Sequence, residues 1–429
     1  MQNEQQQILM ETQQKDGPRR CIVATNVAET SMTIDGVVFV IDSGFCKRKM
    51  YNARSKLESL LVQRISRASA TQRAGRAGRT QPGKCFRLYT EQCFRETMKE
   101  IVPEIKHTNL DSVILRLKKC GIDDIYQFHL IDAPSPDSIH HSIRLLTDLG
   151  ALDNLGRITP LGEHINILPV DPPLARMMLE SVKLRCTKEV ICICAMLSAP
   201  KCFRRPRRRR NEADNAKVKF TDDRGDHLTL LRVYKAFAAI PTDQKDDKLR
   251  KDWCFENFLN YRSLQFADDV QNQLENIMRK RLHVEVVRFA RRLLYEIGLR
   301  PASTGLFRRA QKGFYVTVES QMNSEGAATG GESDHRFLLH YSSVLFQGKT
   351  YTPSRPEWVL FNETIQHDEQ GQQFLQTVSV VRPEWLAQVA PIYRSQISTA
   401  SPEVDKLLKE REKGTISGIV EEFSNILQF

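Results

Sequence analysis

The sequence predicts a multidomain protein with an α/β part, an α part and a β part in that order. Two short apolar segments, 21–26 and 37–42, enclose a polar loop, which is typical of a parallel α/β sheet. Helical periodicity dominates residues 101–300, and from Lys312 onward apolar and polar residues alternate as in strands. A chain of 429 residues has room for three or four domains of ~100–200 residues each.

The octapeptide Gln72–Arg79 carries three arginines among alanines and glycines. If the segment is helical, as its alanines and the capping Ser66 indicate, Arg76 and Arg79 share one face and Gln72 lies one turn earlier. Forked guanidinium donors match phosphate oxygens and can neutralise the charge on a departing γ-phosphoryl group. The alternative, a solvated basic helix, would favour lysine and glutamate over glycine. The composition therefore favours phosphate contact.

Two further strand signals surround this octapeptide. Residues 45–65 alternate apolar and polar side chains on either side of the basic segment 52–56, which predicts a long β-hairpin with a basic tip. Residues 83–89 predict another strand of the α/β part.

The central region reads as a winged helix followed by a helical bundle. Helical stretches at 110–119 and 139–149 precede a short wing at 153–158. Further amphipathic helices are expected at 172–184, 188–197, 226–239 and 252–281. Short strands at 313–318, 337–340, 358–363 and 374–381 belong to an expected five-stranded barrel.

Six arginines fill the segment Arg204–Arg210, which Asn211–Asp214 follows. Three interpretations are open: a nuclear import signal, a phosphate-binding patch, and a mobile, solvated loop. If the segment binds RNA, Arg207 and Arg208 are its candidate contacts.

The bulk composition points to a polyanionic partner. The formal net charge is +11 and the isoelectric point is about 9.1. The ten cysteines form no Cys-x-x-Cys pair and no histidines stand at finger spacing, so we expect reduced core cysteines and no metal ligands. We expect no membrane partner, because no apolar run approaches the ~20 residues of a membrane span.

These segments resemble the C-terminal portion of the DEAH-box (DEAH/RHA) ATP-dependent RNA helicases. Residues 24–31 match the family's motif V and residues 72–79 its motif VI, in the same order and spacing. The resemblance continues through residues 109–110, 117–124, 225–231, 260–264 and 381–386. Within the family, the chain is most similar to the G-patch-activated member of pre-mRNA splicing and ribosome biogenesis.

The resemblance implies four domains and a tail. They are a partial second RecA-like domain with a parallel sheet, motifs V and VI and the hairpin (1–98), a winged helix (99–168), a helical-bundle ratchet domain (169–305), an OB-fold barrel (306–400) and a C-terminal tail (401–429). In the family the hairpin leans on the RNA channel. The residues alone equally allow a structural flap.

The resemblance also implies roles for individual residues. As catalytic residues, Arg76 and Arg79 would reach the γ-phosphate while Gln72 orients the attacking water. The implied nucleotide-binding residues are Met10, in the place of the family's adenine-stacking aromatic residue, Thr33, Asp35 and Gly75. The implied RNA-binding residues are Thr25, Asn26, Arg54 and Lys56, whereas Arg207 and Arg208 are candidates from the arginine run itself, which exceeds the family's usual pattern. Taken alone, Thr25 would be a strand cap and Asp35 a turn residue, but their joint occurrence favours the family roles.

The phosphate cradle Gly-x-x-x-x-Gly-Lys-Ser/Thr does not occur in the sequence. In the family this cradle and the metal-binding acidic motif belong to the first RecA-like domain. We therefore expect ATP and Mg²⁺ as cofactors, with the Mg²⁺ ligands coming mainly from that domain. We expect the chain as given, a truncated product or part of a longer protein, to be unable to hydrolyse ATP alone.

Two functions follow as expectations. In the first, the chain is the C-terminal part of an ATP-dependent RNA helicase of pre-mRNA splicing or ribonucleoprotein remodelling. In the second, it is a non-catalytic fragment that binds RNA or helicase activators. The implied partners are single-stranded RNA held by its backbone, a G-patch activator, and spliceosomal or pre-ribosomal particles. The implied location is the nucleus, in nucleoplasm and nucleolus, with the cytoplasm as a second location.

Overall fold

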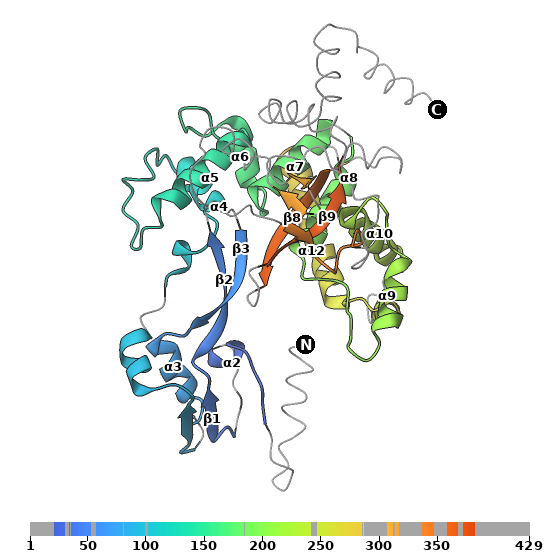
Figure 1. Ribbon diagram of the computed structural model, residues 1–429. Coiled ribbons are helices and arrows are strands. Elements are labelled where there is room, and N and C mark those ends of the chain that lie inside the picture. Colours follow the sequence, from blue (N-terminus) through green and yellow to red (C-terminus); the bar gives the residue numbers. More distant parts are fainter. Residues whose placement is uncertain are drawn as a thin grey trace, which may run out of the picture. The chain divides into compact units, whose positions relative to one another are not determined.

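The structure is a computed structural model of the chain (Figure 1). It describes residues 21–30, 34, 36–52, 57–79, 81–98, 102–183, 185–241, 247–284, 286, 307–311, 314–316, 337–346, 358–367 and 372–381. The chain divides into two compact units, the first comprising residues 1–51 and 59–108, the second comprising residues 52–58 and 109–429. The expected C-terminal tail lies outside the described residues.

The α/β part contains a two-stranded parallel sheet, a hairpin and short helices. Its elements are α2 (Val27–Thr30), β1 (Phe39–Asp42), β2 (Phe45–Asn52), β3 (Leu57–Arg64), α3 (Arg67–Ala74), β4 (Lys84–Arg87), a π-helical turn (Cys93–Thr97) and a 3-10 turn (Glu104–Lys106). β1 pairs with β4 in parallel, and β2 pairs with β3. The predicted strands at 37–42 and 83–89 and the predicted hairpin are confirmed.

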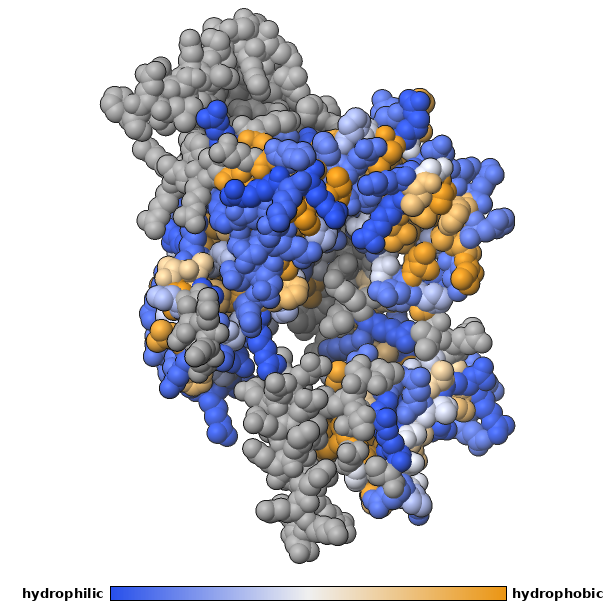
Figure 2. All heavy atoms as spheres, turned by 180° about the vertical axis from the view of Figure 1, so that it is seen from behind, coloured by the Kyte–Doolittle hydropathy of each residue, from blue (hydrophilic) through white to orange (hydrophobic). Residues whose placement is uncertain are grey.

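The strand predicted at 21–26 is not formed. Residues 21–25 have no regular structure, and Val23 is 94% exposed. A strand is stable only beside a ladder partner, and the described residues supply none at this segment. Apolar side chains of the β1–β4 region are also exposed, namely Phe39, Ile41, Phe86 and Leu88. Figure 2 shows hydrophobic residues, in orange, gathered at several places on an otherwise hydrophilic face.

Three helices form the winged-helix region, of which the first two were predicted and the last two have a side-chain cap at their N-terminus. They are α4 (Asp111–Lys119), α5 (Pro136–Asp148) and α6 (Pro160–Ile167). α5 begins at Ser135, whose hydroxyl accepts from the Ser138 N–H at 3.2 Å, and proline follows the cap. The wing is a tight turn in which the Asp153 N–H donates to the Arg157 carbonyl at 2.8 Å.

Among the described residues, six helices form the bundle that follows. They are α7 (Pro172–Lys183), α8 (Thr187–Ser198), α9 (Arg210–Val218), α10 (Asp226–Ala238), α11 (Lys248–Glu256) and α12 (Tyr261–Lys280). α8 lies at the centre, with residues 189–196 buried, and packs against α7, α10 and α12. It also carries two of the five buried cysteines, Cys192 and Cys194. The predicted core position is wrong for the other five cysteines, of which Cys21 and Cys120 are exposed.

The bundle departs from the prediction at two places. The helix expected over 252–281 is broken between α11 and α12, because Phe258 has a φ of 53° and Leu259 bridges to Phe203 instead of continuing the helix. α9 was not predicted as a helix, because its sequence begins inside the arginine run and offers no apolar stripe to signal one.

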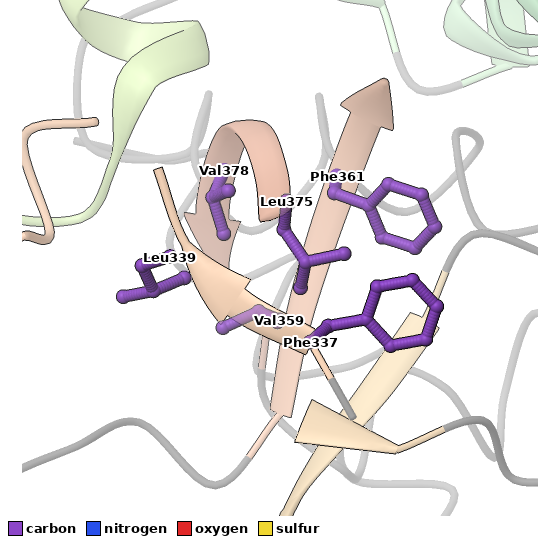
Figure 3. Close-up of a cluster of buried hydrophobic side chains, with 6 residues drawn as sticks. All are labelled: Phe337, Leu339, Val359, Phe361, Leu375 and Val378. Atoms are coloured by element: carbon purple, nitrogen blue, oxygen red, sulfur yellow. The ribbon is translucent and has the colours of Figure 1, made fainter. Parts of the chain in front are cut away.

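Five strands close a barrel, as predicted. They are β5 (Phe307–Gln311), β6 (Phe314–Val316), β7 (Phe337–Leu339), β8 (Trp358–His367) and β9 (Gln372–Val380), in the order β5-β6-β7-β9-β8. Only β7 and β9 run parallel among the recorded pairs. Phe337 and Leu339 on β7 and Val359 and Phe361 on β8 are alternate residues, whereas Leu375 and Val378 on β9 are three apart. Together they form the buried cluster shown in Figure 3.

A buried polar contact joins α10 to the barrel, and we call it the α10–barrel junction (Asp226, His227 and Ser379). The Asp226 carboxylate accepts from the backbone N–H groups of Val344 at 2.8 Å and Val378 at 2.7 Å. His227 Nδ1 lies 2.8 Å from the Ser379 hydroxyl. The bundle and the barrel are therefore fixed to each other by hydrogen bonds between residues far apart in sequence. Among the described helices, none is long and apolar enough to cross a membrane.

Candidate functional site

The arginine octapeptide is only partly helical. α3 begins after Ser66, whose hydroxyl accepts from the Ser69 N–H at 3.1 Å, which confirms the predicted cap. The helix ends at Ala74, and the N–H of Arg76 then donates to the Arg73 carbonyl at 3.1 Å in a tighter turn. Glycines at 75 and 78 are poor helix formers, so the expected continuous helix face is wrong.

Of the three predicted catalytic residues, one therefore lies on helix α3 and two lie in the turn that follows it. Gln72 occupies the last turn of α3 and is exposed, whereas Arg79 is exposed in the turn that follows. Arg76 is half-buried, and its guanidinium donates to the backbone carbonyl of Glu29 on α2. The structure thus brings motifs V and VI together through Arg76, while Gln72 and Arg79 are open to a ligand.

A second cluster beneath these residues was not predicted, and we call it the Arg73 cluster (Arg73, Glu29, Asp42 and Tyr89). Arg73 Nε lies 3.0 Å from a Glu29 carboxylate oxygen, and Arg73 Nη1 lies 2.8 Å from Asp42 Oδ1. The Tyr89 hydroxyl donates to the other oxygen of Asp42 at 2.9 Å. Arg73 also donates to the Phe45 carbonyl at 3.2 Å. The cluster ties α2, the end of β1 and the end of β4 to α3.

The ion pairs of this cluster are largely shielded from solvent, which strengthens the attraction between their charges. The Asp42 side chain is 0% exposed, and those of Arg73 and Glu29 are 16% and 11% exposed. Burial opposes the charge on Arg73, but the hydrogen bonds to Asp42 and Glu29 outweigh it and raise the pKa of Arg73. Burial and the bond to Asp42 also raise the pKa of Tyr89. The sequence signal that points to this cluster is the lone carboxylate at the end of an apolar strand, Asp42.

The predicted RNA-binding residues of motif V lie at the start of α2. Thr25 and Asn26 are exposed, and their carbonyl groups accept from the N–H groups of Ala28 at 3.1 Å and Glu29 at 3.0 Å. These bonds close the first turn of the short helix and leave both side chains on its surface. Glu29 also contacts Arg73, so Thr25 and Asn26 are held close to motif VI.

The other predicted residues divide into described and undescribed positions. Met10, Thr33, Asp35, Arg54 and Lys56 lie outside the described residues. Gly75 is the exposed residue that ends α3. Arg207 and Arg208 are exposed in the turn that leads into α9. In the described part of the chain, no three His, Cys, Asp or Glu side chains are placed to hold a metal ion.

Comparison with known families gives four matches along the chain. Residues 1–81 match the helicase conserved C-terminal domain. Residues 142–170 and 171–230 match the winged-helix and ratchet-like helicase associated domains (HA2). Residues 308–393 match an oligonucleotide/oligosaccharide-binding (OB) fold.

The matches follow the order helicase C-terminal domain, winged helix, ratchet and OB-fold, which is the C-terminal architecture of DEAH/RHA helicases. The helicase C-terminal and OB-fold matches indicate nucleic-acid binding. The predicted domain boundaries and site roles stay predictions.

Proposed function

We propose that this chain supplies the arginine fingers and part of the RNA-binding surface of an ATP-dependent RNA helicase. One observation carries the proposal: the three arginines of motif VI are in different environments. Arg73 is buried between two carboxylates, whereas Arg79 is exposed three residues after the half-buried Arg76. The buried contacts of Arg73 fix the backbone of the motif, while Arg79 remains exposed. This arrangement is preorganised to bind a phosphate group supplied by another domain.

The chemistry follows from the open side chains. The guanidinium of Arg79 can donate to γ-phosphate oxygens and stabilise the charge that develops as the phosphoryl group is transferred. Gln72 can orient the attacking water through its amide. Arg76 lies between them in the same motif, and its guanidinium donates to the Glu29 carbonyl.

The donor set described fits the phosphate end of ATP and not its metal. The exposed Gln72 amide and Arg79 guanidinium can donate to phosphate oxygens, while the described residues gather no carboxylate cluster for Mg²⁺. When bound, Mg²⁺ would neutralise phosphate charge, and its ligands would come mainly from another domain.

The proposed RNA contacts and cellular role rest on the motif V surface and the domain order. Thr25 and Asn26 are exposed at the start of α2, where hydroxyl and amide groups can bond RNA phosphates. We further propose action on spliceosomal or pre-ribosomal particles in the nucleus with a G-patch activator. The support is the similarity of motifs V and VI and of the following segments to that member of the family.

The decisive experiment measures RNA-stimulated ATP hydrolysis by the chain alone and with a separately expressed first RecA-like domain of a close relative. We expect hydrolysis only in the mixture. Replacing Arg79→Ala should reduce it about 1,000-fold or more, as for other arginine fingers. Arg67→Ala removes an exposed arginine from the start of α3, the helix that precedes Arg79, and should leave the rate unchanged.

Other outcomes have definite meanings. A mixture whose activity survives Arg79→Ala contradicts the finger assignment. A mixture without activity that still binds RNA favours the non-catalytic binding fragment. Turnover by the chain alone, lost in Arg79→Ala, overturns the requirement for the other domain.

A further inference from the structure

The arginine run between α8 and α9 is a folded feature, and we call residues 204–210 the basic turn. The Arg204 N–H donates to the Phe258 carbonyl at 2.8 Å. Just upstream, the Cys202 carbonyl accepts from the Asn260 N–H at 2.7 Å. The Arg209 N–H donates to the Pro206 carbonyl at 3.1 Å, which closes a turn around residues 207 and 208. The mobile-loop interpretation is therefore not favoured.

Two arginines of the basic turn are held by carboxylates of α9. Arg205 makes a two-pronged contact with Asp214, with distances of 2.8 and 2.7 Å. Arg209 donates from Nε and Nη2 to one oxygen of Glu212 at 3.0 and 2.6 Å, and its guanidinium lies 4.6 Å from the centre of the Phe258 ring. These hydrogen bonds lower the pKa values of Asp214 and Glu212.

The other four arginines of the basic turn have no carboxylate partner among the described residues: Arg204, Arg207, Arg208 and Arg210. All four are exposed. The carboxylates of α9 nearest in sequence, Glu212 and Asp214, are already occupied by Arg209 and Arg205. The result is a local excess of positive charge on a backbone that is fixed at both ends.

We propose that the basic turn binds the phosphate backbone of RNA through these four arginines. Adjacent like charges repel one another, and a polyanion that neutralises them also releases its counterions. Arg207 and Arg208 occupy the two central positions of the closed turn and both are exposed, so both guanidinium groups are accessible to phosphates. The inference deepens the RNA-binding part of the proposed function and rests on it for the identity of the polyanion.

The backbone geometry argues against the import-signal interpretation. A receptor that reads a basic segment as an extended strand requires free main-chain groups and an open backbone. Here the turn from Pro206 to Arg209 is closed, and the Arg204 N–H is bonded to Phe258. Such recognition would first have to break these bonds and the Arg205–Asp214 pair. Phosphate binding needs only the exposed side chains.

The test measures the binding of a fluorescein-labelled 20-nucleotide oligouridine to the full chain by anisotropy, at several salt concentrations and without ATP. We expect Arg207→Ala with Arg208→Ala to weaken binding about tenfold at 0.1 M salt, and to reduce the slope of log K against log salt by about 1.4, which is about 0.7 per lost phosphate contact. The charge-conserving Arg207→Lys with Arg208→Lys should retain most of the affinity.

The matched control is Lys280→Ala with Arg281→Ala, which removes two adjacent exposed cations at the end of α12. Equal losses in both double variants would overturn the inference in favour of a general charge effect. Unchanged RNA binding, with nuclear accumulation of a fluorescent fusion lost, would overturn it in favour of an import signal. If the wild-type chain itself does not bind the RNA, this inference fails, while the arginine-finger proposal is still decided by the ATP hydrolysis experiment.

Discussion

The Arg73 cluster and the α10–barrel junction are two buried polar clusters that solve the same problem by different chemistry. Each joins segments that lie far apart in sequence. In the Arg73 cluster, opposite charges satisfy each other, with Arg73 between Glu29 and Asp42. In the junction, Asp226 accepts backbone N–H groups and His227 contacts a serine hydroxyl.

The difference predicts different sensitivities. An ionic cluster depends on every partner, because removal of one leaves another charge buried and unpaired. The α10–barrel junction, which pairs its side chains with backbone and neutral groups, should tolerate substitution better. Its stability should nevertheless depend on pH, because burial disfavours the charged forms of Asp226 and His227. Burial lowers the pKa of His227 to about 4 and raises that of Asp226.

The largest expected effect is that of Arg73→Ala. The substitution leaves the Asp42 carboxylate, which is 0% exposed, without its cation, and we expect a loss of about 3–5 kcal/mol in the stability of the first unit. Hydrogen exchange of α3, β1 and β4 should accelerate about 100-fold or more. The matched control Arg79→Ala removes an exposed arginine from the same motif and should leave this exchange unchanged. Equal exchange in the two variants would show that the cluster has no structural role.

Acid should weaken the junction through His227. Buried His227 stays neutral in the folded protein, whereas in the unfolded chain its imidazole accepts a proton below about pH 6.5. Unfolding therefore takes up a proton, and stability decreases as the pH is lowered. Between pH 7 and pH 4.5 the loss from His227 is about 2–3 kcal/mol. Urea unfolding followed by tryptophan fluorescence measures it, because Trp253 packs against the rings of Phe220 and Phe237.

The comparison of wild type with His227→Gln isolates this effect. Burial raises the pKa of Asp111 to about 6 and also raises that of Asp226, and both groups act in the opposite direction, losing stability as the pH rises. Both are present in the two proteins, so their contributions cancel in the difference. His129→Gln, at an exposed position, is the control. A pH dependence that is the same in wild type and His227→Gln would contradict the assignment.

The sequence predicts the elements that depend on local pattern. Periodicity locates α7, α8 and α10 to within a few residues, and alternation locates the hairpin and the barrel strands. The failures depend on distant partners. The segment 21–26 has strand-like residues without a ladder partner among the described residues, and the break at Phe258 depends on Phe203.

The candidate site shows the same division. The octapeptide identifies motif VI, but the sequence does not distinguish its three arginines. Arg73 differs from Arg79 only because Glu29 and Asp42, both distant in sequence, surround it in the fold. Likewise, carboxylates on α9 separate the held Arg205 from the open Arg207. Which arginines remain available for a ligand is a property of tertiary contacts.

A smaller effect, from Asp226→Asn, sharpens the comparison. The amide keeps the shape of the carboxylate but offers one acceptor oxygen, so one of the N–H groups of Val344 and Val378 loses its partner. We expect a loss of about 1–3 kcal/mol, below that of Arg73→Ala. Hydrogen exchange in residues 341–346 and 372–381 reports it. Asp223→Asn, an exposed neighbour, should change nothing, and a larger loss than in Arg73→Ala would reverse the ranking of the two clusters.

The smallest effect belongs to Arg205→Ala, which breaks an ion pair that is not buried. The side chains of Arg205 and Asp214 are 51% and 47% exposed, so solvent and salt screen their attraction. We expect a loss of no more than about 1 kcal/mol, further reduced at high salt, in urea unfolding followed by tryptophan fluorescence. A loss comparable to that of Arg73→Ala would mean that geometry, and not burial, makes an arginine structural in this protein. A small loss in Arg205→Ala beside a large loss in Arg73→Ala would show that the two-pronged Arg205–Asp214 contact orients the basic turn without stabilising the fold.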